Sequence, residues 1–223
     1  MANEDFEIIT FDCYGTLIDW EGGIVAAFQS QARHHGIELE ADRIMETYMA
    51  IEPQVESDSY MPYRDVLART AAKVADRLGW QLPPEEGDFL PASLPDWLPF
   101  ADTNDALERL SRRFQLGLLS NIDDDLLTAT RRHFTIPFEL IVTAEQVRSY
   151  KPAHAHFAEA RRRMGEKRWL HAAQSYFHDV IPASEFHTPV AWVNRKAEQV
   201  TRGGPQPTYE VRNIAELADL LGV

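Results

Sequence analysis

Strand-like and helix-like segments alternate along most of this chain, and this alternation limits the possible folds more than any other feature. Short apolar runs rich in β-branched and aromatic residues are typical of buried strands, and amphipathic stretches separate them. The runs cover residues 6–11, 114–119, 138–142, 169–173 and 190–193. Strands that alternate with helices form a parallel sheet with crossover helices. The sequence therefore predicts an α/β fold built on a parallel sheet.

The interval from Trp20 to Pro99 departs from this alternation. Its pattern is strongly helical, it contains no convincing strand, and prolines gather towards its end. The best helices in it cover residues 24–35, 40–51 and 63–78. Outside it, helices are predicted over residues 103–113, 123–133, 153–164 and 214–221. We interpret the interval as a helical insertion after the first strand; a helical extension packed permanently on the sheet is the alternative.

Asp12 ends the first apolar run, and Gly15 follows three residues later. Open α/β sheets bind ligands at the carboxyl ends of their strands, and glycine lets the backbone approach a ligand closely. The Asp12 carboxylate is therefore a candidate nucleophile, while a turn-capping aspartate is the alternative. Cys13 is the only cysteine, so no internal disulfide is possible. We interpret Cys13 as a small buried filler.

Three later segments place further polar groups after predicted strands. Ser120 and Asn121 can supply hydrogen-bond donors in front of a helix, or simply cap it. Lys151 can keep Asp12 ionised and hold an anionic substrate. Asp179 adds a second carboxylate, which suits a metal site or a base that activates water, unless it only caps the next helix.

The charge balance excludes some classes of partner. The chain has 22 basic and 35 acidic residues, a formal net charge of −13. Nucleic acids and anionic membranes are recognised through basic patches, so neither is expected as a partner. The polar, acidic N-terminus (residues 1–5) is unlike a signal peptide, and no apolar run is long enough to span a bilayer. With one cysteine, these features favour the cytoplasm.

The ordered motifs resemble those of the haloacid dehalogenase (HAD) superfamily. Residues 11–19 resemble its motif I, and Ser120 with Asn121, Lys151 with Pro152, and Asp179 follow in the order of motifs II, III and IV. The resemblance implies a Rossmann-like core over residues 1–19 and 98–223, with a helical cap over residues 20–97. It also implies that Lys151 pairs with the nucleophile Asp12. Related enzymes often form dimers, so the resemblance also implies a homodimer.

Two positions separate the chemistries of this superfamily. HAD phosphatases carry a second aspartate two residues after the nucleophile, where this chain has Tyr14, and an acidic pair in motif IV, where it has Gln174 and one acid. The Asp-x-Tyr-Gly-Thr sequence, ending at Thr16, resembles the L-2-haloacid dehalogenase (type II) branch instead. That branch implies attack of Asp12 on the α-carbon of a short 2-halocarboxylate and hydrolysis of the ester with help from Asp179. No cofactor is then expected.

The same branch implies further contacts. Asp12, Lys151, Asp179, Ser120 and Thr16 would be catalytic, and Tyr14, Asn121 and Arg43 would bind the substrate. Arg43 would be the cap arginine that binds halide and carboxylate, with Arg64 as a competing candidate. Where these dehalogenases have Ser, Asn and Tyr, this chain has Gln174, Tyr176 and Phe157.

Two alternative functions remain open on the sequence. One is a Mg²⁺-dependent phosphatase for small molecules, with Asp12, the carbonyl of Tyr14 and Asp179 as metal ligands. The other is a catalytically impaired HAD-fold binding protein, which Gln174 and Phe157 favour.

Overall fold

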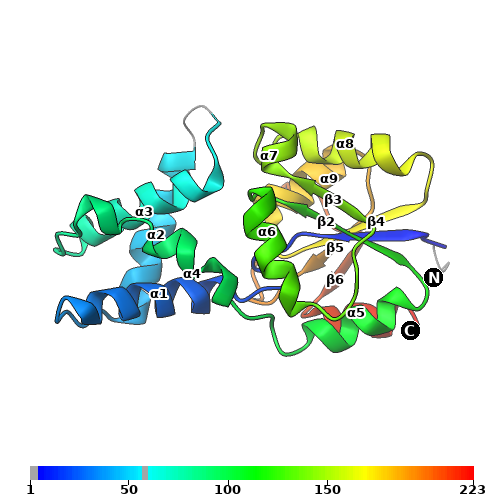
Figure 1. Cartoon of the computed structure of the whole chain (residues 1–223). Helices are drawn as coiled ribbons and strands as arrows, with labels where there is room; N and C mark the ends of the chain where they lie inside the picture. Colours follow the sequence, from blue (N-terminus) through cyan, green and yellow to red (C-terminus); the bar gives the residue numbers. More distant parts are fainter. Residues whose placement is uncertain (1–4, 57–59) are drawn as a thin grey trace. The chain divides into compact units, whose positions relative to one another are not determined.

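The computed structural model describes residues 5–56 and 60–223 (Figure 1). Residues 1–4, part of the acidic N-terminus discussed above, lie outside the described residues. The contacts divide the chain into two units. We call residues 5–19, 99–121 and 133–223 the sheet unit, and residues 20–98 and 122–132 the helical unit. The predicted cap boundaries stay a prediction; residues 122–132 group with the helical unit.

The sheet unit is built on one six-stranded parallel sheet with strand order β3-β2-β1-β4-β5-β6. The strands are β1 (Ile8–Phe11), β2 (Gln115–Ser120), β3 (Leu140–Thr143), β4 (Trp169–Ala173), β5 (Val190–Val193) and β6 (Tyr209–Val211). Three of them, β1, β4 and β5, are buried at every residue, as expected for strands covered on both faces. This confirms the predicted α/β fold. The structure adds to the five predicted strands a sixth, the short edge strand β6.

Helices of the sheet unit connect and cover these strands. They are α5 (Thr103–Ser111), α7 (Ala144–Val147), α8 (Ala155–Met164), α9 (Ile181–Glu185) and α10 (Ile214–Leu220). A π-helical turn (Tyr176–Val180) precedes α9. Helix α8 packs on β2 and β3, and α10 packs on α5. An apolar cluster that includes Phe157, Trp169 and Trp192 fills the interior.

The helical unit contains α1 (Trp20–His34), α2 (Ala41–Glu56), α3 (Tyr63–Arg77), α4 (Phe89–Ser93) and α6 (Asp124–Thr130). Short 3₁₀ turns cover Pro84–Glu86 and Leu94–Asp96, and a third (Arg131–His133) follows α6. The three long predicted helices are confirmed, although α2 continues through Pro53. The Phe28 and Phe89 rings meet edge to face at 5.0 Å inside this unit. Its interior is therefore made by aromatic and aliphatic side chains.

The chain leaves and re-enters the sheet unit at neighbouring points. Ile18 and Pro99 form an antiparallel bridge, and the Phe100 amide donates to the Leu17 carbonyl at 3.0 Å. The Arg195 guanidinium donates to the Thr16 carbonyl at 2.8 Å and to Asp102 at 2.9 and 3.1 Å. Arg195 thus fastens the departing and returning segments to each other.

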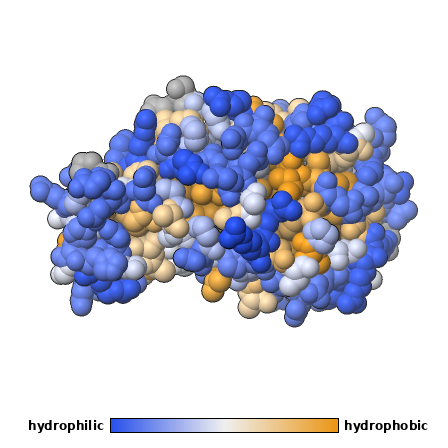
Figure 2. Space-filling model, viewed as in Figure 1, coloured by the Kyte–Doolittle hydropathy of each residue, from blue (hydrophilic) through white to orange (hydrophobic). Residues whose placement is uncertain are grey.

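The described helices include none that is long and apolar enough to cross a membrane. On the face drawn in Figure 2, hydrophilic side chains cover most of the surface and hydrophobic ones show between them. The large apolar side chains that are exposed, among the described residues, are Met49, Leu98, Phe177 and Leu220.

Candidate active site

Asp12 is the first residue after β1, and its loop is held in place by hydrogen bonds. Its amide donates to the Ala172 carbonyl at 3.1 Å. Gly15 adopts φ of +94°, a conformation that side-chain-bearing residues avoid, so the glycine is required by this turn. The turn brings Thr16 Oγ1 to 2.9 Å from Asp12 Oδ2, to which it donates. The amide of Gln174 donates to the same hydroxyl at 2.9 Å, which leaves the Thr16 proton for Asp12.

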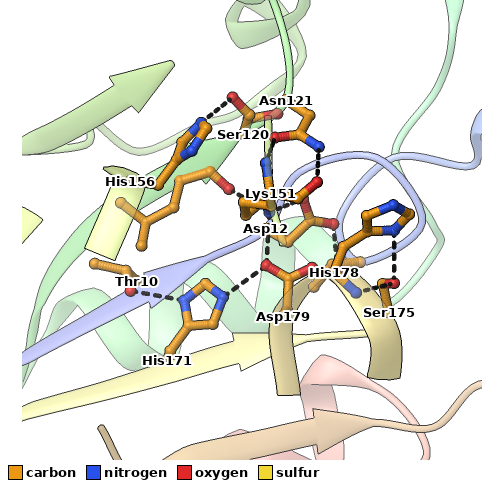
Figure 3. A network of polar contacts seen from close by, with 12 residues as sticks. Thr10, Asp12, Ser120, Asn121, Lys151, His156, His171, Ser175, His178 and Asp179 are labelled. Atoms are coloured by element: carbon orange, nitrogen blue, oxygen red, sulfur yellow. Dashed lines mark hydrogen bonds and ion pairs between the residues drawn. The ribbon is translucent and has the colours of Figure 1, made fainter. Parts of the chain in front are cut away.

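Lys151 joins the two predicted acids. Its Nζ donates to Asp12 Oδ1 at 2.9 Å and to Asp179 Oδ1 at 2.6 Å (Figure 3). A third bond reaches the Leu119 carbonyl at 2.9 Å. Lys151 is only 2% exposed, and each of the three N–H groups of its ammonium has an acceptor in the protein. Asp12, Lys151 and Asp179 therefore form one buried cluster, although 167 positions separate the first from the last.

Ser120 and Asn121 lie at the carboxyl end of β2. The Asn121 side chain exchanges two hydrogen bonds with the main chain of Lys151, at 2.7 Å with the amide and 3.0 Å with the carbonyl. Asn121 therefore fixes the main chain at Lys151. The contact of Asn121 with substrate stays a prediction. Ser120 Oγ is buried and has no hydrogen-bond partner among the described residues. Asp123 is the residue at the N-cap position of α6, but its side chain makes no capping hydrogen bond to that helix.

Asp179 sits in the π-helical turn after β4. The turn begins at Ser175, whose Oγ accepts the His178 amide at 3.1 Å. Asp179 Oδ1 accepts from Lys151 and also lies 3.0 Å from His171 Nε2. Asp179 Oδ2 is buried and has no partner among the described residues. One carboxylate oxygen is therefore held by two donors, and the other is available.

His171 is a site residue that the sequence did not reveal. It lies inside the apolar strand β4, beside Thr10 on β1 in the sheet register. Its Nδ1 is 2.9 Å from Thr10 Oγ1, which in turn accepts from Trp169 Nε1 at 2.7 Å. The sequence shows only a polar residue within an apolar run, because the register that sets it beside Thr10 exists only in the folded sheet.

The surroundings shift the pKa values of the cluster in different directions. Burial raises the pKa of Asp12, and the charge of Lys151 only partly offsets it. Burial acts in the same sense on Asp179, but the Lys151 charge and the His171 hydrogen bond outweigh it, so the pKa of Asp179 lies below its usual range. Burial opposes the charge of Lys151, but the two carboxylates raise its pKa. Asp179 is thus the carboxylate most firmly held in its ionised form.

The remaining predicted positions are more dispersed. Tyr14 is half-buried in the loop after Asp12. Phe157 is buried and packs edge-on against the His171 ring at 5.2 Å. Tyr176 donates to the Pro205 carbonyl at 2.7 Å. Cys13 is buried as predicted, and burial raises the pKa of its thiol well above the usual value.

The two candidate arginines both belong to the helical unit. Arg43 is exposed on α2. Arg64, at the start of α3, forms ion pairs with Asp123 and Asp125.

The donor set does not fit a magnesium ion that bridges the carboxylates. Mg²⁺ requires oxygen ligands at about 2.0–2.1 Å in an octahedron. Here the Lys151 ammonium already joins Asp12 to Asp179, and Asp179 Oδ1 also contacts His171. Within residues 5–56 and 60–223, no group of three or more His, Cys, Asp or Glu side chains is arranged to hold a metal ion.

Comparisons with known proteins find relatives in sequence and in fold. The chain is 29% identical over 228 residues to an (S)-2-haloacid dehalogenase from Pseudomonas putida, covering 96% of this chain and 95% of that protein. An (S)-2-haloacid dehalogenase from Pseudomonas fluorescens is 32% identical over 127 residues, 55% of this chain and 56% of that protein. In structure, the L-2-haloacid dehalogenase RSc1362 matches with a TM-score of 0.85 at 21% identity, covering 98% of this chain and all of that one.

A family model described as haloacid dehalogenase-like hydrolase matches residues 6–173. The match includes Asp12, Ser120 and Lys151, and it covers well over half of the sequence. The chain therefore belongs to the haloacid dehalogenase-like hydrolase family.

Proposed function

We propose that this hydrolase is a 2-haloacid dehalogenase that converts short (S)-2-halocarboxylates to 2-hydroxy acids through an ester on Asp12. The observation that carries the proposal is the buried Asp12–Lys151–Asp179 cluster, in which one ammonium links a nucleophile to a second carboxylate. A relative that matches along nearly its full length is an (S)-2-haloacid dehalogenase, which supports the choice of substrate.

In the first step an Asp12 oxygen attacks the α-carbon of the substrate. A carbon–oxygen bond forms, the carbon–halogen bond breaks, and the halide leaves with the bonding electrons. Halide departure requires no proton, which suits a site where Tyr14 stands in place of a general acid. Attack from the side opposite the halogen inverts the α-carbon, so an (S)-substrate gives an (R)-hydroxy acid. Thr16 and Lys151 orient the attacking carboxylate through its two oxygens.

In the second step water hydrolyses the ester. The water oxygen attacks Cγ of Asp12 while its proton passes to Asp179 Oδ2, the oxygen without a partner among the described residues. The bond between Cγ and the alkyl oxygen then breaks, and the departing oxygen takes the proton from Asp179. The Asp12 carboxylic acid that remains releases a proton, so substrate and water become hydroxy acid, halide and H⁺. Lys151 and Ser120 can stabilise the negative charge that develops at the ester carbonyl.

Substrate recognition is assigned to Tyr14, Asn121 and Arg43. Tyr14 and Asn121 lie in the sheet unit at the ends of β1 and β2, next to the catalytic groups. Arg43 is the favoured cap arginine, because its guanidinium has no ion pair or hydrogen bond among the described residues, whereas the Arg64 guanidinium pairs with Asp125. Neither metal nor organic cofactor enters these steps. A cytoplasmic homodimer without nucleic-acid partners is the setting that the composition and resemblance favour.

The test is a substrate panel with a matched pair of variants. The panel holds both enantiomers of 2-chloropropionate, haloacetates, and p-nitrophenyl phosphate with Mg²⁺. Wild-type protein should release halide from the (S)-haloacid with or without EDTA. Asp12→Asn should lower that rate by at least about a thousand-fold. Asp105→Asn, on the exposed surface of α5, should not change it. Full activity in Asp12→Asn would exclude the mechanism, and phosphate release alone would favour the phosphatase.

A single turnover in ¹⁸O-labelled water tests the ester directly. The hydroxyl oxygen of the first product comes from Asp12, so that product should carry no label while Asp12 acquires it. Label in the product of the first turnover would mean that water attacks the substrate without an ester.

A further inference from the structure

A buried relay of polar groups continues from the candidate site into the middle of the sheet. Trp169 Nε1 donates to Thr10 Oγ1. Figure 3 shows the next two links, from Thr10 to His171 and from His171 to Asp179. Thr10 and His171 are almost without exposed surface. Burying an imidazole without partners is unfavourable, so both ring nitrogens need hydrogen bonds. The proposed reaction has so far given this histidine no role.

The hydrogen-bond donors along the relay determine which ring nitrogen carries the proton. The Trp169 indole can only donate, so Thr10 Oγ1 must accept from it. The Thr10 hydroxyl then has its own proton to place, and His171 Nδ1 is the acceptor that the structure provides at 2.9 Å. In the neutral ring the proton is therefore on Nε2, which donates to Asp179 Oδ1 at 3.0 Å. A protonated Nδ1 would leave the Thr10 proton without this acceptor.

This arrangement fixes the orientation of the Asp179 carboxylate. Lys151 Nζ and His171 Nε2 both donate to Oδ1, from two different elements of the sheet unit. Two donors on one oxygen restrain rotation of the carboxylate and leave Oδ2 as the available oxygen. Phe157 packs against the edge of the imidazole at 5.2 Å and limits movement of the ring.

We propose that His171 is a positioning residue that holds Asp179 with Oδ2 free to take the proton of the hydrolytic water. The inference rests on the proposed dehalogenase mechanism and adds a residue to its second step. His171 does not contact the reacting atoms. Its removal should therefore slow hydrolysis of the Asp12 ester and spare the formation of that ester.

The experiment compares wild type with His171→Leu and His171→Gln. Leucine removes the donor to Asp179, while the glutamine amide can restore it. His171→Leu should lower kcat by about 100-fold. It should lower KM in parallel, because kcat/KM reports only the steps up to the irreversible loss of halide. Rapid quenching should show one equivalent of halide released in a burst, and mass spectrometry should show most of the protein esterified. His171→Gln should recover most of kcat.

The possible outcomes are distinguishable. Equal loss of kcat and kcat/KM in His171→Leu, without trapped ester, would reduce the residue to a structural role and overturn the inference while the dehalogenase function stands. If wild-type protein released no halide from any 2-haloacid, the proposed function itself would fail and the inference with it.

A second measurement serves if the leucine variant does not fold. Long-range ¹H–¹⁵N NMR spectra of the wild-type imidazoles report which nitrogen is protonated. We expect one histidine in the Nε2–H form whose signals change in Thr10→Val but not in Thr188→Val. Thr188 is another buried threonine, and its hydroxyl lacks a partner among the described residues. An Nδ1–H form or an imidazolium at that position would overturn the inference.

Discussion

Two aspartates, one in each unit, are buried to a similar extent but are bound in opposite ways. Asp123 of the helical unit is 3% exposed, and its two oxygens accept the amides of Tyr63 and Arg64 at 2.8 and 2.9 Å. Asp179 of the sheet unit is 1% exposed, and both of its donors, on Lys151 and His171, share one oxygen. The first carboxylate is saturated and fixes the start of α3. The second keeps one oxygen without a partner among the described residues.

The difference shows that burial alone does not identify a reactive carboxylate. Both residues would be selected by a search for buried charge, and both are stabilised by hydrogen bonds to the ionised form. What separates them is where the donors lie. A carboxylate with a main-chain amide on each oxygen anchors a helix N-terminus. A carboxylate with an ammonium and an imidazole on one oxygen is held in place without being fully occupied.

Substituting the two aspartates should separate the two roles most clearly. Asp179→Asn should reduce kcat by about 10²- to 10⁴-fold and trap the Asp12 ester, since the amide cannot accept the proton of water. Asp123→Asn should trap no ester, but should lower the free energy of unfolding by about 1–3 kcal/mol, because one amide of α3 loses its acceptor. Quenched-flow mass spectrometry and urea unfolding measure the two effects. Ester trapped in Asp123→Asn would contradict the comparison.

Removing the ammonium that links the acids should give the next largest effect. Lys151→Met leaves two buried carboxylates facing each other, and the loss of one partner of a buried ion pair costs about 3–5 kcal/mol. Urea unfolding at neutral pH should show this loss. Lys73→Met, on the exposed surface of α3, serves as the control and should change stability by less than about 0.5 kcal/mol. A Lys151→Met protein as stable as wild type would mean that the acids are protonated rather than paired.

The smallest expected effect concerns His156, a buried histidine outside the relay. Its Nε2 donates to the Ser120 carbonyl at 3.2 Å, and burial lowers its pKa to about 3. The unfolded chain binds this proton near pH 6.5 and the folded chain does not, so stability falls as pH decreases from about 6.5 towards 3. Between pH 7 and pH 5 the loss should be about 1–2 kcal/mol.

His156→Gln should remove that part of the acid dependence. His34→Gln, at an exposed position on α1, should keep it. Urea unfolding at both pH values measures the difference. An unchanged pH dependence in His156→Gln would show that the ring is protonated in the folded protein.

The sequence predicted the elements that have strong periodicity and missed the short ones. The β4 and β5 strands agree with their predicted limits because β5 is a continuous apolar run and His171 alone interrupts β4. The three-residue strand β6 and the short helices α4, α7 and α9 were not predicted, because a single turn or an edge strand carries too few residues to show a pattern. The structure starts β1 at Ile8 rather than Phe6.

The site was predictable to the extent that its residues follow strands. Asp12, Ser120 and Lys151 stand at or beyond strand ends, where the topology of a parallel sheet brings loops together. His171 and Arg195 act through contacts that depend on strand register and on a distant turn, so no local pattern points to them. That Asp179 Oδ2 has no partner among the described residues also depends on side-chain conformation, because Lys151 and His171 both donate to Oδ1.

The bridge between Ile18 and Pro99 has a bearing on how such proteins diversify. Because the ends of the intervening segment are already fastened together, the connectivity of the sheet is independent of what the segment contains. Each doubling of the length of a flexible loop adds only about 0.6 kcal/mol to the free-energy cost of closing it. Because Arg195 bonds both to Asp102 and to the Thr16 carbonyl at this point, a longer, shorter or unrelated insertion can replace the present one without changing the strand order of the sheet.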